Sequence, residues 1–141
     1  MTNAETITKL VRDSFAGQSG EFRPCAYLDD DLDCIRILTR DCSITETRVN
    51  RLLTVLEATY PERLGGRKCV GFTIKGARHF CQEQGLSLTT PIAISQLLDA
   101  IIAACPDTVV EAFVDHVARP LVREANITKV EPMTEGELVT V

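Results

Sequence analysis

Apolar and polar residues alternate with different periods along the chain, and each change of period marks a new part of the fold. In the first part the apolar residues recur at helical spacing: Ile7, Leu10, Val11 and Phe15. Thr2 and Glu5 have the spacing of a capping box, and Gly17 supplies a stop. This pattern predicts an amphipathic helix over residues 3–16.

Residues 24–74 show the short period of β-strands. Apolar or β-branched runs are separated by turn residues, and the runs are 25–28, 34–38, 43–49, 52–56 and 69–74. The links between them are tight, and residues 60–66 form an obvious break. The pattern predicts an antiparallel sheet of four or five strands, arranged as a meander.

Helical spacing returns over residues 75–125. We expect one helix from Lys75 to Gln84, closed by Gly85, and a second that begins with Thr90 as its cap and Pro91 at the first helical position. Thr108 and Glu111 repeat the capping-box form before a further helix. Pro120 should kink or end that helix, because proline lacks an amide hydrogen and clashes one turn back. The acidic tail, 131–141, should be loose.

These elements together predict an α+β fold in which helices pack on an antiparallel sheet, within a single domain over residues 1–141. At 141 residues the chain is long enough to bury a sizeable core, and its 45% hydrophobic content is that of a globular protein. Aromatic residues make up only 5%, so aliphatic side chains must build most of the core.

The sequence predicts a cytoplasmic protein with no membrane contact. It shows no apolar run long enough to span a bilayer and no basic segment before an apolar one at its start. Its six cysteines form no Cys-x-x-Cys pair and stand mostly among apolar neighbours. In a reducing compartment we expect them to be small core residues and not disulfides.

The middle of the chain resembles a small, uncharacterised bacterial family of β-rich domains. The resemblance runs from Leu28 to Phe80, and the residues that carry it are Asp29, Asp33, Ile35, Ile37, Glu46-Thr47 and Val70-Gly71-Phe72-Thr73-Ile74. The sequence departs from the family pattern at Leu28, where tyrosine is expected, and in a longer link over residues 61–67. The resemblance implies a small sheet with a packed helix and assigns no chemistry.

Two clusters raise the question of a metal site, and neither has the required spacing. Asp29-Asp30-Asp31-Leu32-Asp33 is rich in oxygen ligands, but the twelfth position of an EF-hand loop counted from Asp29 holds Arg40 and not Glu. We interpret it as a solvated turn between strands. His79 and Cys81 lie two apart, which on a helix points them to different sides. No metal ligand and no cofactor is therefore assigned.

A basic segment is the strongest candidate for a binding site. Between residues 63 and 79 there is no acidic residue, and the basic residues are Arg63, Arg67, Lys68, Lys75 and Arg78. Glycines beside these charges would let backbone amides approach an anion. The alternative is a set of ordinary solubilising charges at a hairpin tip. The net charge of −5 disfavours a dedicated nucleic-acid protein.

The function that these observations favour is a non-enzymatic interaction or accessory module. No catalytic residue is assigned, because no motif places a cysteine or serine beside a histidine. The aliphatic helices carry more apolar surface than one thin sheet covers, so we expect the protein to bind a second copy of itself, or another protein. The surface would be the second face of the sheet or the helices over residues 91–121. Anion or nucleic-acid binding through Arg63 to His79 is the alternative.

Overall fold

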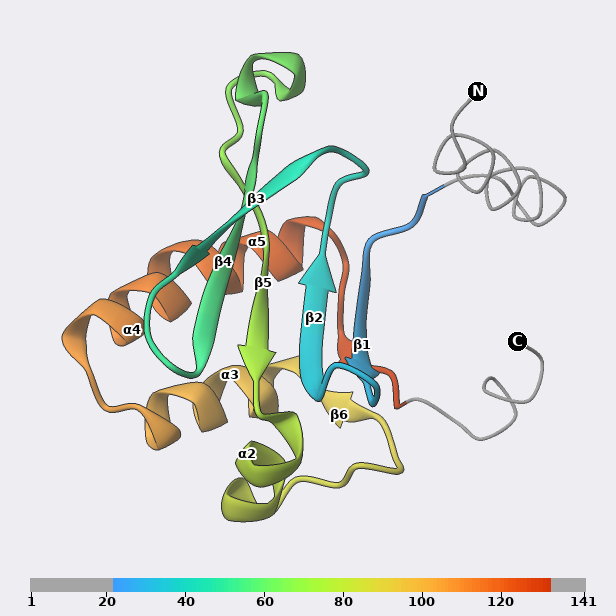
Figure 1. The fold of residues 1–141 in the computed structure, drawn as a ribbon, viewed down its shortest axis with the longest axis vertical. Helices are drawn as coiled ribbons and strands as arrows, with labels where there is room; N and C mark the ends of the chain where they lie inside the picture. The colour runs from blue at the N-terminus through green and yellow to red at the C-terminus, as the bar shows by residue number, and fades with distance from the viewer. Residues whose placement is uncertain (1–21, 133–141) are drawn as a thin grey trace, which may run out of the picture.

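A five-stranded antiparallel sheet forms the centre of the molecule (Figure 1). The computed structural model describes residues 22–132. The strands are β1 (Cys25–Asp29), β2 (Cys34–Leu38), β3 (Ile44–Arg48), β4 (Leu53–Ala58) and β5 (Cys69–Lys75). The predicted α+β fold with an antiparallel sheet is confirmed.

The order of the strands differs from the expected meander. The sheet runs β1-β2-β5-β4-β3, so β2 and β3 follow each other in the chain but lie on either side of β5 and β4. The physical reason is burial. Residues Val70 to Ile74 of β5 are all buried, whereas four of the five residues of β3 are exposed. The most apolar strand takes the centre, and the most polar one takes an edge.

Helices cover one face of this sheet; in Figure 1 most of them lie behind it, and the one that follows β5 lies below its end. They are α2 (Ala77–Gln84), α3 (Ile94–Ala104) and a continuous helical stretch made of α4 (Thr108–Phe113), the π-helical turn η2 (Val114–Ala118) and α5 (Arg119–Glu124). A short 3-10 turn, η1 (Pro61–Leu64), and a two-stranded pair, β6 (Ile92–Ala93) and β7 (Lys129–Val130), complete the described elements.

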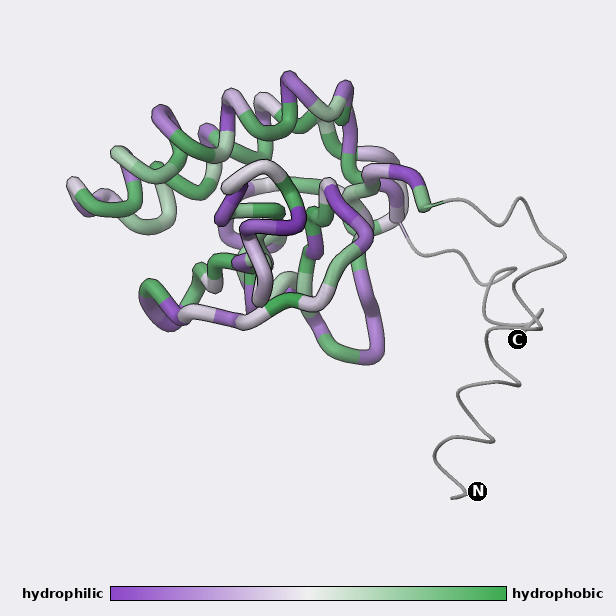
Figure 2. Tube along the Cα trace, turned by 90° about the horizontal axis from the view of Figure 1, so that it is seen from above, coloured by the Kyte–Doolittle hydropathy of each residue, from purple (hydrophilic) through white to green (hydrophobic). Residues whose placement is uncertain are grey.

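The main core lies between the sheet and the helices, where Figure 2 shows apolar segments of the helices turned inward. Phe72 of β5 meets Phe113 of α4 edge to face, with ring centroids 5.7 Å apart. Leu97, Leu98 and Ile101 of α3 are almost wholly buried in the same core. A smaller cluster on the other side of the sheet contains Leu56, Ala58 and Val70.

Three predicted helix starts are wrong. Lys75 still belongs to β5, and α2 begins at Ala77. Pro91 does not open a helix: Ile92 and Ala93 pair with Val130 and Lys129, and α3 begins only at Ile94. A pairing between segments so far apart in the sequence outweighs the local signal of Thr90-Pro91. At the next helix the cap is Asp107 and not Thr108, since an Asp107 carboxylate oxygen accepts a hydrogen bond from the Val109 amide at 2.7 Å.

Pro120 does not end its helix, which continues to Glu124. The turn before it is π-helical, and the Arg119 amide donates to the Val114 carbonyl, five residues back. The wider turn accommodates a residue that cannot donate and whose ring would clash in a regular α-turn. α2, in contrast, ends at Gln84 with Gly85 in the left-handed conformation, as predicted.

The predicted helix over residues 3–16 lies outside the described residues, as does most of the acidic tail. Glu131, at the start of that tail, exchanges backbone hydrogen bonds of 2.9 Å with Leu28 and Ala26 of β1. Within residues 22–132 no helix has the length and apolar character to cross a membrane. All six cysteines are free thiols, with Cys34 and Cys81 buried and the others half-buried.

Candidate functional site

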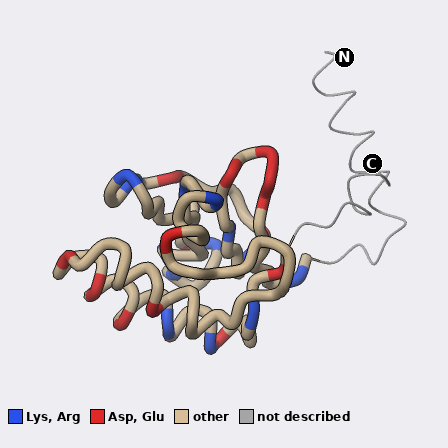
Figure 3. Tube along the Cα trace, turned by 90° about the horizontal axis from the view of Figure 1, so that it is seen from below, with Lys and Arg blue, Asp and Glu red and all other residues tan. Residues whose placement is uncertain are grey.

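The basic segment does not form one site. Arg63 lies in η1, and Arg67 and Lys68 immediately precede β5. Lys75 ends that strand, and Arg78 lies in α2 beyond it. A strand of seven residues extends over roughly 20–25 Å. The five charges therefore divide between the two ends of β5. Figure 3, too, shows Lys and Arg scattered over the molecule and not gathered on one face.

Most of these charges also have a partner. Arg67 pairs with Glu124, and Arg78 with Asp30. The Lys68 ammonium lies 3.3 Å from a carboxylate oxygen of Glu57. The Arg63 guanidinium lies 4.5 Å from the centre of the Tyr60 ring. Arg67, Lys68 and Arg78 thus pair with acidic residues from other parts of the fold, while Arg63 and Lys68 remain exposed to solvent.

The acidic turn between β1 and β2 holds α2 in place. Asp33, with a positive φ of 49°, accepts two bonds from the first turn of that helix: its carbonyl from the Ala77 amide at 3.0 Å and its carboxylate from the Arg78 amide at 2.9 Å. The negative charge stabilises the positive end of the helix dipole. The interpretation as a turn between strands is correct, but the sequence did not reveal this capping role.

Lys75 is surrounded by polar side chains from other elements. It lines a small pocket of about 240 Å³ with Arg51, His79, Glu83 and Cys105. His79 lies 3.0 Å from Glu83, so the histidine already has an acidic partner. Sequence reasoning missed Arg51, which lies outside the basic segment and joins Lys75 because β4 and β5 pair.

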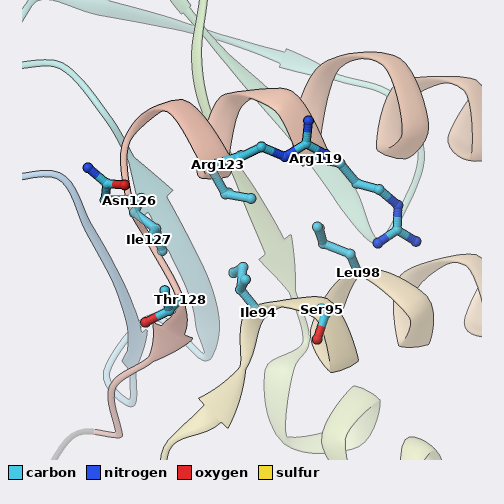
Figure 4. Close-up of a pocket in the computed structure, with 9 residues that line it drawn as sticks. Ile94, Ser95, Leu98, Arg119, Arg123, Asn126, Ile127 and Thr128 are labelled. Atoms are coloured by element: carbon cyan, nitrogen blue, oxygen red, sulfur yellow. The ribbon is translucent and has the colours of Figure 1, made fainter.

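A larger groove of about 460 Å³ lies between the start of α3 and α5. Figure 4 shows its residues coming from three places: Ile94, Ser95 and Leu98 from α3, Arg119 and Arg123 from α5, and Asn126 to Thr128 from the segment that follows. The Ile94 amide donates to the Thr128 carbonyl at 2.9 Å, which joins the two sides at one end.

The floor of the groove is apolar and its rim is polar. Leu98, Val122 and Ile127 form the floor and are buried, and the half-buried Ile94 supplies accessible aliphatic surface beside them. Ser95, Asn126 and Thr128 are exposed at the rim and bear hydroxyl or amide groups. An apolar floor with a few polar groups around it is the usual lining of a ligand site.

The two arginines of the groove differ in whether they have acidic partners. Arg119 donates to Asp99 at 2.7 Å and to Asp115 at 3.1 Å, and these hydrogen bonds raise the pKa of its guanidinium. Its charge is therefore balanced and its position set. Arg123 is exposed, and within residues 22–132 no acidic side chain forms an ion pair with it. Arg123 is the group that remains able to bind an acid from outside.

Histidine and cysteine side chains do not converge on a metal site in the described part of the chain. No group of three His, Cys, Asp or Glu side chains there has the geometry to hold an ion. His79 is exposed, whereas Cys81 is buried on the core side of α2.

No protein family, curated protein or solved structure matches this chain. The resemblance of residues 28–80 to a bacterial domain family stays a prediction, and it assigns no activity. The fold and the groove between α3 and α5 are what define the protein: an α+β domain with one sheet face covered by helices and a ligand-sized groove in the helical layer.

Proposed function

We propose that this protein is a non-enzymatic interaction module that binds a short segment of a partner protein in the groove between α3 and α5. The observation that supports the proposal is the composition of the groove, an aliphatic floor beside the guanidinium of Arg123, which has no acidic partner among residues 22–132. We further propose that the module acts as a homo-oligomer in the cytoplasm, a compartment that suits six free thiols.

The chemistry of the groove defines the segment that it would bind. An aliphatic side chain of the partner would pack on the half-buried Ile94, above the floor that Leu98 and Val122 form, and would remove its remaining apolar surface from water. A neighbouring carboxylate would pair with Arg123, whose planar guanidinium suits a carboxylate. The hydroxyls of Ser95 and Thr128 would bond the backbone of the bound peptide. The partner segment therefore carries an acidic residue next to an aliphatic one.

The pocket around Lys75 supports a second candidate, the binding of a small anion. Arg51 and Lys75 both line it, and neither forms an ion pair within residues 22–132. Inorganic phosphate would be the first probe, with perturbed NMR signals at both residues as the expected result. Unchanged signals there would remove this candidate.

The groove is tested with isotope-labelled protein and an acetylated hexapeptide that contains adjacent Glu and Leu. We expect the peptide to shift the amide NMR signals of Ser95, Leu98 and Thr128. Two matched peptides, one with Lys for Glu and one with Ser for Leu, should bind less tightly because each removes one half of the complementarity. Equal shifts with all three peptides, or shifts away from the groove, would contradict the proposal.

A pair of charge-reversal variants separates the groove from general electrostatics. Arg123→Glu should abolish binding of the acidic peptide, because it places a like charge at the rim. Arg63→Glu changes the net charge by the same amount at an exposed residue outside the groove. It should bind the peptide like the unaltered protein. Equal losses in both variants would show that only overall charge matters.

A further inference from the structure

The outer edge of β3 presents backbone groups that nothing in the described part of the chain binds. β3 ends the sheet beyond β4. Just outside β3, the Thr59 amide donates to the Ser43 carbonyl, and the Val49 amide donates to the Leu53 carbonyl. Ser43 and Val49 are therefore in hydrogen-bonded pairs with the neighbouring strand. Hydrogen-bonded and non-hydrogen-bonded pairs alternate in an antiparallel ladder. The N–H and C=O groups of Ile44, Glu46 and Arg48 therefore point outward.

The opposite edge of the sheet is different. There the backbone of Glu131 bonds to Leu28 and Ala26 and covers part of β1. An edge strand with free backbone groups is a template for another strand unless something blocks it. β3 contains no proline and no bulge, and its five residues pair with β4 in continuous register.

We propose that β3 pairs with β3 of a second copy of this chain, antiparallel, with Thr47 on the two-fold axis. In this register Glu46 of each copy lies directly opposite Arg48 of the other. Opposite charges that face each other across a ladder stabilise the pairing. Glu46 and Arg48 both have outward backbone groups. The two Glu46–Arg48 pairs, one on each side of the axis, therefore form about four backbone hydrogen bonds between the copies.

Charge excludes the neighbouring registers. With Glu46 on the axis, the two Glu46 carboxylates would face each other, and like charges directly opposite are destabilising. With Arg48 on the axis, the two Arg48 guanidinium groups would face each other, which is destabilising for the same reason. With Thr45 on the axis, Ile44 would face Glu46, and Arg48 would face Cys42. The Thr47 register alone places both charged residues opposite a partner of the other sign. The sequence Glu46-Thr47-Arg48 is thus complementary to itself in antiparallel pairing.

The surroundings of β3 leave room for a second copy. Thr45 and Thr47 point to the side of the sheet that carries the helices, yet both are exposed. The helical layer therefore does not extend over this edge. Pairing two sheets of five strands would give one continuous sheet, with the helices of both copies on the same side. This surface is separate from the groove. The inference rests on the homo-oligomer of the proposed function and gives it an interface, whereas peptide binding in the groove is tested by separate experiments.

Charge-swap variants test the interface by light scattering over a concentration series. We expect the full chain to show twice its mass as concentration rises. Glu46→Arg and Arg48→Glu should each remain monomeric at concentrations where the unaltered chain is a dimer. The double variant, Glu46→Arg with Arg48→Glu, restores opposite charges in the same register and should dimerise again.

Any result of the light-scattering series other than this one overturns the proposal. A monomer throughout the series refutes the dimer, and single variants that dimerise normally refute β3 as the interface. A double variant that stays monomeric refutes the register. Circular dichroism identical to that of the unaltered chain verifies that each variant is folded.

Cross-linking tests the register directly. Residues on the axis form a non-hydrogen-bonded pair with Cα atoms about 4.5 Å apart, within reach of a disulfide. Under mild oxidation T47C should give a disulfide between the two copies at residue 47, located by mass spectrometry of its peptides. T45C, whose partner in this register is Val49, should give none at residue 45. A link in T45C and not in T47C would overturn the register, and the absence of both would overturn the pairing.

Discussion

Replacement of Thr73 by valine should make the protein more stable. Thr73 lies in β5 at the centre of the sheet, opposite Arg36 on one side and Thr54 on the other. It is only 3% exposed, and its hydroxyl oxygen is a buried side-chain atom with no hydrogen-bond partner in the described structure. A polar group buried without a partner lowers stability, so its removal is favourable.

The expected change in the free energy of unfolding follows from the loss of the Thr73 hydroxyl. A buried group without a partner costs about 1–3 kcal/mol of desolvation. Valine has the same branched shape and places a methyl group where the hydroxyl was, so backbone and rotamer are kept. We expect Thr73→Val to raise the free energy of unfolding by about 1 kcal/mol, the lower end of that range.

A second threonine provides the matched control. Thr39 is also buried, at 7% exposure, but its hydroxyl donates to the Val70 carbonyl at 2.8 Å. Thr39→Val makes the same chemical change and removes a hydrogen bond worth about 1 kcal/mol. The two substitutions should therefore shift stability in opposite directions.

Urea unfolding followed by circular dichroism measures both changes. The midpoint should move up for Thr73→Val and down for Thr39→Val, with the slope unchanged in each. A lower midpoint for Thr73→Val would refute the reasoning, because it would mean that the Thr73 hydroxyl has a partner. A shift of both variants in one direction would show that the change of side chain, and not the hydrogen bond, decides the effect.

Three further predictions concern packing and ionisation. Leu98→Ala should cost about 2–5 kcal/mol because Leu98 is 1% exposed; a loss below about 0.5 kcal/mol in urea unfolding would place it outside the core. Gly71→Ala should cost about 3 kcal/mol or more, since an added Cβ would lie 2.1 Å from the Ile37 carbonyl oxygen; normal stability would contradict this close approach. Burial raises the pKa of four thiols, those of Cys25, Cys34, Cys69 and Cys81. The unfolded chain therefore ionises first, and stability should fall as pH rises above about 8.5; an equal urea midpoint at neutral pH and at about pH 9.5 would contradict this.

The local elements were largely predictable, because each depends on residues that are neighbours in the chain. Ile35 and Ile37 lie two residues apart on either side of Arg36, and this period of two is a property of the extended backbone itself. Gly85 ends α2 because a residue without a side chain adopts the left-handed conformation readily. In both cases the signal and the structure lie within a few residues of each other.

The candidate sites were not predictable to the same degree. The basic segment is continuous in the sequence, but β5 runs through its middle and separates Arg67 from Lys75. The groove, in contrast, brings Leu98 next to Val122 and Thr128, which come from different elements. Sequence reasoning named the helices over residues 91–121 as a partner surface, and no motif marked Arg123 or the segment after α5.

The sequence by itself determined the kind of secondary structure at most positions and the α+β class, because periodicity and turn residues act through the local backbone. Only the tertiary structure decided the order of the strands, the pairing of Ile92 with Val130 in place of a helix start, and the partners of Arg67 and Arg78. These depend on contacts between residues far apart in the chain. The free energy of such contacts comes from burying whole faces of strands and helices against each other. The sequence of a single segment does not specify which face it will meet.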